Sequence, residues 1–273
     1  MTAPQLAWNF DPGVLASIAV FAGLYAWRFR VARRDAGGRG TEAWRALAAV
    51  SAVVVLLVAV VSPVDRLGED YLFSLHMTQH VLLGDIAPLL ALLALSRVIL
   101  RPLTRRLMAV ERALGPLAHP GSGLVLWLVL VYAWHVPVMY TAALENPVVH
   151  AVEHACFFVA GVAVWWPLVQ PIPMRRSLTG LWTFAYIGAA KVGLAGLGLY
   201  LVWTDTVVYP YYERVPRVWG LSAIDDQNVG GALMMVEQST VLALVLMVLF
   251  VRMLGQADEQ DLRRERLEDR STA

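Results

Sequence analysis

The sequence has little charge, and this excludes a water-soluble globular protein. Only 16% of its 273 residues are Asp, Glu, Lys or Arg, against about 25% in a typical soluble domain, and 58% are hydrophobic. The 22 basic and 21 acidic residues nearly cancel. A chain with no basic excess lacks the electrostatic footprint of nucleic-acid binding, so we expect no nucleic-acid partner.

Cysteine and lysine are almost absent. The single cysteine, Cys156, excludes an intramolecular disulfide framework and a thiolate metal cluster within one chain. The motif C-x-x-C-H is missing, which excludes covalent haem attachment. Lys191 is the sole lysine, so 21 of the 22 basic residues are arginine.

What the sequence does have is a series of long apolar runs. A hydrocarbon core of about 30 Å is crossed by a helix of about 20 apolar residues. The runs predict an all-α fold, a seven-transmembrane-helix bundle. The predicted spans are residues 12–28, 45–62, 71–96, 122–144, 147–170, 178–203 and 227–251.

The ends of the chain complete this organisation. We expect residues 1–255 to form a single transmembrane domain and residues 256–273 to form a charged cytoplasmic tail. No basic region precedes the first span and no small-residue cleavage site follows it. The first span is therefore expected to be a retained helix and not a signal peptide.

The distribution of arginine predicts the orientation. Eighteen of the 21 arginines lie in the loops after the first, third and fifth spans or in the tail. The other three are Arg66, Arg214 and Arg217. Basic residues gather on the cytoplasmic side of membrane proteins, so we expect the N-terminus outside and the C-terminus in the cytoplasm.

Five of the six histidines fall within the predicted spans. His76 and His80 are four residues apart, as are His150 and His154. This spacing puts both members of a pair on one face of a helix. At 1.5 Å per residue from the outer ends, His80, His135 and His154 lie at a depth of about 12–14 Å. Clustered polar groups in a membrane indicate a functional site, here one that binds a metal or haem.

Methionines accompany these histidines. Met77 lies between the first pair, Met139 follows His135 by four residues, and Met234 and Met235 lie at a similar depth in the last span. Imidazole with thioether and without a thiolate pair favours copper, particularly Cu(I), over Ca²⁺ or Mg²⁺. Zinc is an alternative through imidazoles alone, and haem is another, because histidines facing each other across two helices resemble axial haem ligands.

Two further groups are candidates for a functional role. Asp226 and Gln227 lie at the predicted outer mouth, beside Gly230 and Gly231, which allow close helix approach. Acidic residues at such helix starts are either N-caps or a negative mouth that attracts a cation.

The other group consists of Asp85 and Lys191, which fall near the middle of the bilayer and are expected to pair between the third and sixth spans. Such a pair either holds the bundle together or conducts protons or ions, and both interpretations stay open.

The order of these motifs resembles a known family. The motifs are His76-Met77-x-x-His80, Trp134-His135-x-Pro137, His150-x-x-x-His154 and Asp226-Gln227-x-x-Gly230-Gly231-x-x-Met234. In this combination, from about residue 65 to 252, the chain resembles the CtaG-type multi-span membrane proteins, which are assembly factors of cytochrome c oxidase. The resemblance implies a multi-pass protein of the bacterial plasma membrane that supplies copper during assembly of a haem–copper oxidase.

This resemblance, together with the residues, defines the expected function. The expected partners are a haem–copper oxidase subunit, a periplasmic copper donor and the lipid bilayer, and the oligomeric state stays open. We expect no enzymatic activity, because the sequence has no nucleophile–base pair, phosphate loop or carboxylate pair suited to catalysis. The alternatives are a haem-binding redox or haem-transfer protein, and an ion transporter that uses Asp85 and Lys191.

Overall fold

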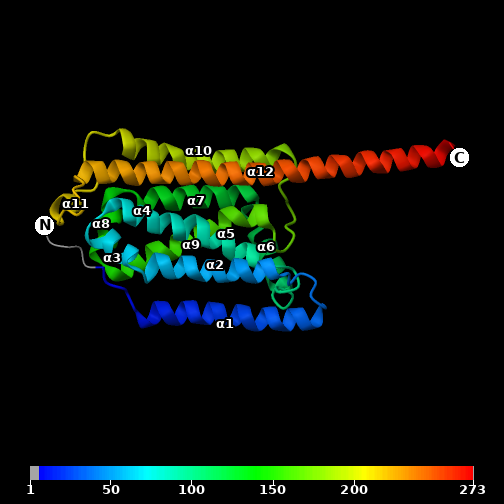
Figure 1. The fold of residues 1–273 in the computed structure, drawn as a ribbon, viewed down its shortest axis with the longest axis horizontal. Helices are drawn as coiled ribbons and strands as arrows, with labels where there is room; N and C mark the ends of the chain where they lie inside the picture. Colours follow the sequence, from blue (N-terminus) through cyan, green and yellow to red (C-terminus); the bar gives the residue numbers. More distant parts are fainter. Residues whose placement is uncertain (1–5, 273) are drawn as a thin grey trace.

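The computed structural model describes residues 6–272, except for the side chains of residues 252, 254 and 256–272. Over this range the secondary structure is helical (Figure 1). The helices are α1 (Pro12–Asp35), α2 (Ala43–Val60), α3 (Pro63–Asp70), α4 (Phe73–Val81), the π-helical turn η1 (Leu82–Ile86), α5 (Ala87–Ala94), α6 (Thr104–Leu114), the 3-10 turn η2 (Gly115–Ala118), α7 (Pro120–Trp134), α8 (Pro137–Glu145), α9 (Pro147–Val169), α10 (Leu181–Trp203), α11 (Tyr211–Arg214) and α12 (Ala223–Thr272).

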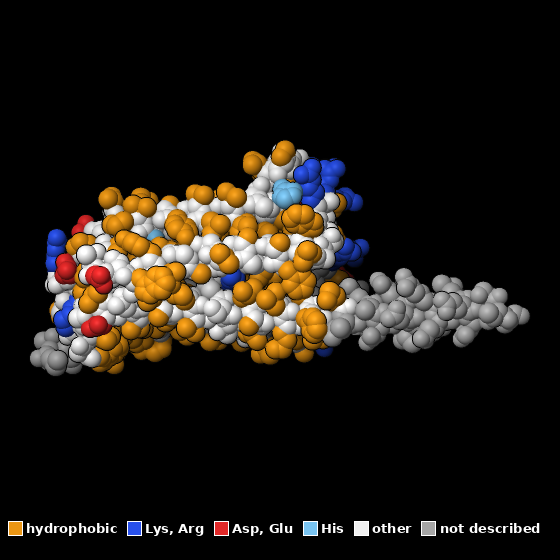
Figure 2. All heavy atoms as spheres, turned by 90° about the horizontal axis from the view of Figure 1, so that it is seen from above, with side chains coloured by type: hydrophobic (Ala, Val, Ile, Leu, Met, Phe, Trp, Pro, Cys, Tyr) orange, Lys and Arg blue, Asp and Glu red, His pale blue; other side chains and the backbone are white. Residues whose placement is uncertain are grey.

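The expected all-helical membrane protein is confirmed at this level. In the described residues, six helices are long and apolar enough to cross a membrane. The count is seven if the pair Thr104–Ala118 and Pro120–Trp134, which is bent by 75°, forms one span. Figure 2 shows hydrophobic side chains over the sides of the body, where a bilayer would contact them.

The middle of the bundle is the broken helix α4–η1–α5, against which α2, α9 and α12 pack (Figure 1). The predicted span 71–96 therefore exists, but it contains a π turn. Pro88 supplies a physical reason, because a proline cannot donate to the carbonyl four residues earlier, that of Gly84, and its ring clashes with that carbonyl. The π turn carries Asp85.

The predicted continuous helix over 122–144 is wrong. Helix α7 ends at Trp134, and α8 begins at Pro137. Val136 is extended, with φ −65° and ψ 129°, as the ring of a following proline requires. His135 thus lies at the corner between two helices instead of inside one.

The last helix is longer than predicted. Residues 227–251 form part of α12, which continues without a break across the predicted boundary at residue 256 and extends beyond the other helices in Figure 1. Helices α10 and α12 pack closely where Gly198 meets Gly231, since a Cβ on Gly231 would lie 2.8 Å from the carbonyl oxygen of Gly198. The close helix approach predicted at Gly231 is confirmed.

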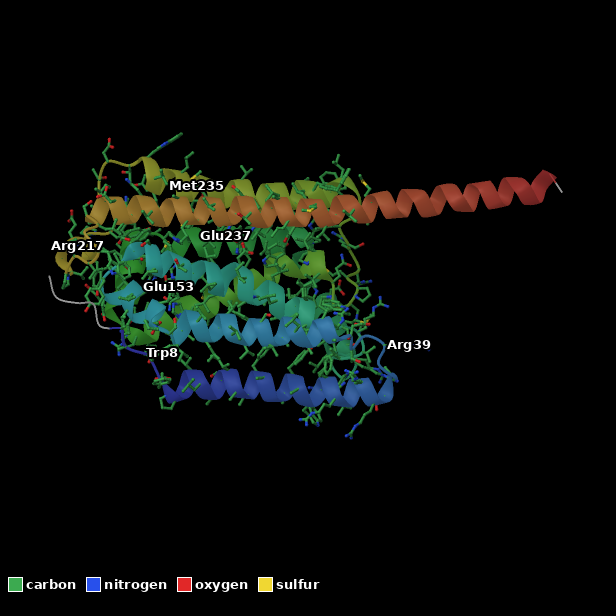
Figure 3. All side chains as sticks on the ribbon, viewed as in Figure 1. Trp8, Arg39, Glu153, Arg217, Met235 and Glu237 are labelled. Atoms are coloured by element: carbon green, nitrogen blue, oxygen red, sulfur yellow. The ribbon has the colours of Figure 1, made fainter. Side chains whose placement is uncertain are left out.

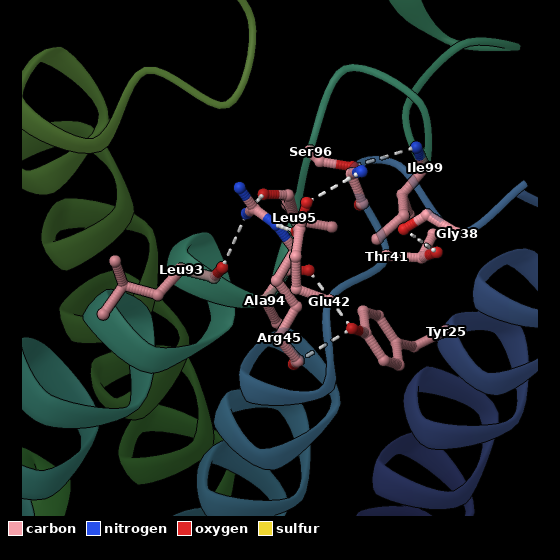
Figure 4. Close-up of polar contacts among 11 residues, drawn as sticks. Tyr25, Gly38, Thr41, Glu42, Arg45, Leu93, Ala94, Leu95, Ser96 and Ile99 are labelled. Atoms are coloured by element: carbon pink, nitrogen blue, oxygen red, sulfur yellow. Dashed lines mark hydrogen bonds and ion pairs between the residues drawn. The ribbon is translucent and has the colours of Figure 1, made fainter. Parts of the chain in front are cut away.

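Arg45 and Tyr25 join α1, α2 and α5 (Figure 4) at the end of the body opposite α11 (Figure 1). The Arg45 guanidinium on α2 donates to the carbonyl oxygens of Leu93, at 3.0 Å, and of Leu95, at the end of α5. The Tyr25 hydroxyl of α1 donates to the carbonyl oxygens of Arg45 and Ala94 at 3.0 and 3.1 Å. The bonds to Leu93, Ala94 and Leu95 satisfy carbonyls that the end of α5 leaves without intrahelical partners.

Charge is sorted between the two ends of the body. In Figure 2 the visible Asp and Glu side chains lie at one end, and most of the visible Lys and Arg side chains lie at the other. Arg39 and Arg217 mark the two ends in Figure 3, and Glu153 lies in the half nearer to Arg217.

Candidate metal centre

Five histidines from three helical segments meet in one cluster. The rings of His76 and His80 on α4 have centroids 4.3 Å apart, and those of His150 and His154 on α9 are 4.0 Å apart. The two pairs face each other, with the His76 and His150 rings stacked at 5.4 Å. His135, at the end of α7, completes the cluster at 5.8 Å from His80. The i,i+4 pairs therefore share one site.

A carboxylate that we did not select from the sequence lies at the centre of this cluster. Glu153 on α9 has 0% of its surface exposed. Its Oε1 lies 3.6 Å from His80 Nε2, and its Oε2 lies 3.8 Å from His76 Nε2 and 4.0 Å from His150 Nε2. The spacing His150-x-x-Glu153-His154 is a signal in the sequence, because H-x-x-E-H is a zinc-binding order in one class of metallopeptidases.

Eight polar atoms of the cluster are buried without a hydrogen-bond partner among the described residues. They are both ring nitrogens of His76 and of His80, Nε2 of His150 and of His154, and both carboxylate oxygens of Glu153. Buried polar atoms are nearly always hydrogen-bonded, because desolvation without a partner costs about 1–3 kcal/mol each. Such a concentration of unpartnered imidazole nitrogens and carboxylate oxygens fits residues that bind a metal ion.

Hydrogen bonds outside the cluster orient two of the rings. His150 Nδ1 lies 2.6 Å from Glu69 Oε1, and His135 Nδ1 lies 2.7 Å from the carbonyl oxygen of Val131. A ring that donates through Nδ1 keeps the lone pair of Nε2 free for a metal. The Nε2 atom of His150 accordingly faces Glu153. The Nε2 atom of His135 lies 3.4 Å from the Met77 sulfur.

The four candidate methionines separate into two groups. Met77 and Met234 are buried and line a cavity of about 30 Å³ together with His80 and His135. Met139 has 41% of its surface exposed, and neither it nor Met235 lines this cavity. Met235 packs against Gly198 of α10. The structure thus brings two of the four thioethers to the histidines.

Buried aromatic side chains cover the cluster on the side of α8 and α11. The Tyr140 ring lies 5.1 Å from that of His76, and its hydroxyl is 3.1 Å from that of Tyr212. Tyr209 donates to the carbonyl oxygen of His135 at 2.9 Å. Burial raises the pKa of Tyr209 and of Tyr212, so both remain neutral hydrogen-bond donors.

Asp226 and Gln227 bind backbone groups. The Asp226 carboxylate accepts from the amides of Phe73, at 2.6 Å, and Ser74, at 3.1 Å, at the start of α4. Gln227 Oε1 accepts from the amide of Val208 at 2.7 Å. This is the geometry of an N-cap and of a loop anchor, which position the first turn of the helix that carries His76.

Asp85 and Lys191 form the predicted ion pair, with Lys191 Nζ 2.6 Å from Asp85 Oδ2. Trp165 Nε1 donates to Asp85 Oδ1 at 2.5 Å, and Gln238 Nε2 donates to Asp85 Oδ2 at 3.3 Å. Asp85 and Gln238 also line the cavity that His80 borders, so the ion pair and the histidine cluster adjoin the same space.

Comparison with known proteins identifies the family to which this arrangement belongs. Residues 23–256 match the sequence profile described as cytochrome c oxidase caa3 assembly factor (Caa3_CtaG). The chain belongs to the Caa3_CtaG family. The resemblance seen in the ordered motifs is thereby confirmed.

Mycobacterial relatives of this Caa3_CtaG chain are uncharacterised proteins. The chain is 25% identical over 284 residues to one from Mycobacterium leprae (strain TN). It is 26% identical over 285 residues to others from Mycobacterium bovis (strain ATCC BAA-935 / AF2122/97) and Mycobacterium tuberculosis (strain CDC 1551 / Oshkosh). Each match covers 96% of this chain and 41% of the relative, so the chain spans less than half the length of these proteins. No solved structure matches.

Proposed function

We propose that this Caa3_CtaG protein binds copper at the histidine cluster and supplies it to a cytochrome c oxidase during assembly. The observation that carries the proposal is the set of buried imidazole nitrogens, on His76, His80, His150 and His154, that have no hydrogen-bond partner in the part of the chain that the structure describes. Imidazole is a strong ligand for copper. Copper is the cargo in this proposal, and the protein needs no catalytic turnover.

Beside Met77, at the edge of the cluster, we propose that copper binds as Cu(I). His135 Nε2 and the Met77 sulfur lie 3.4 Å apart, which supports a position with one imidazole and one thioether ligand. Met234 lines the same cavity. Ligands of this kind would pass the ion to a partner by ligand exchange. Met139 and Met235 remain candidate copper ligands that lie outside this cavity.

We further propose seven spans, with the N-terminus outside and the C-terminus in the cytoplasm, a single domain over residues 1–255 and a cytoplasmic tail over 256–273. The sorting of charge between the two ends supports this orientation. In this topology the histidine cluster lies in the outer half of the bacterial plasma membrane, where a periplasmic donor would supply copper.

The test is the copper content of the purified protein. We expect wild-type protein to retain copper and the double variant His76→Ala/His80→Ala to retain less copper per chain, because the variant lacks one of the two histidine pairs. His119→Ala is the matched control, since His119 caps the start of α7 away from the cluster. Equal copper content in the double variant and the control would contradict the proposal.

Haem and ion transport are the other candidates. The 30 Å³ cavity beside the histidines argues against haem, since sites for small molecules occupy about 300–1,000 Å³. A Soret band from stoichiometric haem in the purified protein would nevertheless favour haem over copper. Transport is favoured by the small cavities that meet at Asp85. Flux into liposomes that disappears in Asp85→Asn would support it.

A further inference from the structure

We propose that the cluster holds two metal ions that share the carboxylate of Glu153. One ion binds His76 and His80 of α4, and the other binds His150 and His154 of α9. This inference rests on the proposed function, because copper is the metal expected at the cluster, and it adds the number of ions and the ligand that joins them.

Each histidine pair forms a complete group with Glu153. In both groups every residue offers a ligand atom, and these atoms lie within 4.8 Å of one another. The separations between the Glu153 oxygens and the facing Nε2 atoms are 3.6 to 4.0 Å. Two ligands bonded at about 2.1 Å to one tetrahedral ion lie about 3.4 Å apart, so small side-chain movements bring either group onto an ion.

The same separations argue against a simpler explanation of Glu153, a hydrogen-bonded ion pair with a protonated histidine. A buried carboxylate is unstable without positive charge nearby, and a protonated histidine would supply that charge. Such a pair forms a charge-assisted hydrogen bond of about 2.7–2.9 Å. None of the three histidine nitrogens that face Glu153 among the described residues lies closer than 3.6 Å. Metal ions between the groups account for both the charge and the spacing.

Both oxygens of Glu153 face α4, and one of them also faces α9. Oε1 faces His80 on α4, whereas Oε2 faces His76 on α4 and His150 on α9. The stacking of His76 on His150 at 5.4 Å keeps the two groups adjacent. In two-metal sites the ions lie about 3.5–4 Å apart, a distance that one carboxylate spans.

The ligand set also defines the class of ion. Both groups contain a carboxylate oxygen, a harder ligand than thioether, and therefore favour divalent Cu²⁺ or Zn²⁺. The Met77 and His135 contact lies at the edge of the cluster, where Cu(I) is favoured. The two groups that contain Glu153 thus favour divalent ions, and the neighbouring position at Met77 and His135 favours Cu(I).

The number of ions can be measured directly. Metal-free full-length protein in detergent is loaded with Cu²⁺ with the reduced state excluded, weakly bound metal is removed, and total copper per chain is compared with the electron paramagnetic resonance spin count. We expect two Cu²⁺ per chain and a spin count well below two, because ions this close couple their unpaired electrons. Zn²⁺ loading provides a count that does not depend on copper redox chemistry.

Variants then assign the positions. His76→Ala/His80→Ala and His150→Ala/His154→Ala should each bind one Cu²⁺ with a full, uncoupled signal. Glu153→Gln should lose the coupling and at least one ion, whereas Glu145→Gln, on the exposed surface of α8, should behave as wild type. The wild-type spin count tests the proposal even if Glu153→Gln does not fold.

The outcomes separate the two proposals. One ion per chain in wild type, abolished by either double variant, would overturn the shared-carboxylate site and leave copper binding intact. Two ions with a full uncoupled signal would also overturn it. Copper content at background in wild type, unchanged in all variants, would overturn both proposals.

Discussion

The carboxylate of Glu69 determines which ring nitrogen of His150 is free to bind a metal. It accepts from His150 Nδ1 at 2.6 Å and so keeps Nε2 as the free lone pair. Such a partner also raises the basicity of the imidazole as a ligand. Because His150 has only this polar contact outside the cluster among the described residues, the effect of Glu69 on metal binding can be isolated.

Glu69→Gln is expected to weaken copper binding about 10- to 100-fold, because the amide supplies no negative charge to His150. Titration against a competing chelator measures this change. Asp70→Asn, which alters the exposed neighbouring acid, is the control and should retain wild-type affinity. Equal affinities of the two variants would refute the role given to Glu69.

Asp85 provides a residue-scale test of stability. Asp85→Asn leaves Lys191 buried without its counter-charge, and breaking a buried ion pair costs about 3–5 kcal/mol. Thermal unfolding in detergent should show a marked loss of stability for this variant and little loss of stability for Asp205→Asn on the exposed loop. The double variant Asp85→Asn/Lys191→Met should recover part of the loss, and failure to recover would contradict this account of the pair.

At the scale of helices, prolines decide where the site residues point. Pro88 follows the π turn that turns Asp85 toward Lys191, and Pro137 begins α8 after the break that leaves His135 at a corner. Apolar length predicted helical, apolar segments in both regions, because hydropathy is averaged over many residues. It did not predict the turn or the break, which depend on local backbone sterics.

Contact between α9 and the π turn permits a second test at this scale. A Cβ on Gly161 would clash with the backbone carbonyl of Gly84, and backbone cannot move aside as a flexible side chain does. Gly161→Ala should therefore lower stability by about 1–3 kcal/mol.

Gly188→Ala is the matched control, because no atom lies within 4 Å of its added Cβ. In the middle of α10 it should raise stability by about 0.5–1 kcal/mol through better helix propensity. Thermal unfolding of the two variants measures both changes. Equal stabilities would rule out close packing at Gly161.

For the whole molecule, the sorting of arginine predicts which end faces the cytoplasm. In a Cys156→Ser background, a cysteine introduced by Arg214→Cys should react with a membrane-impermeant maleimide in intact cells. One introduced by Arg39→Cys should react only after permeabilisation. Both positions are exposed, so a reversed pattern would show an inverted topology.

The sequence by itself determined the class of molecule and most of its helices. The apolar runs predicted 147–170 and 178–203 to within a few residues of α9 and α10, because a buried or lipid-facing helix must be apolar along its whole length. Spacing of four also predicted that each histidine pair would share a face, since this follows from helix geometry alone. These features depend on residues close together in the chain.

Only the tertiary structure decided which groups meet. The position of Glu153 between His80 and His76 requires α9 to pack beside α4, and this in turn requires Gly161 to fit against Gly84. The capping role of Asp226, 153 residues from Phe73, likewise needed the fold. The periodicity of a sequence predicts which residues share one face of a helix, but it does not predict which other helix that face contacts. The partners of Glu153 and Asp226 are therefore determined by packing alone.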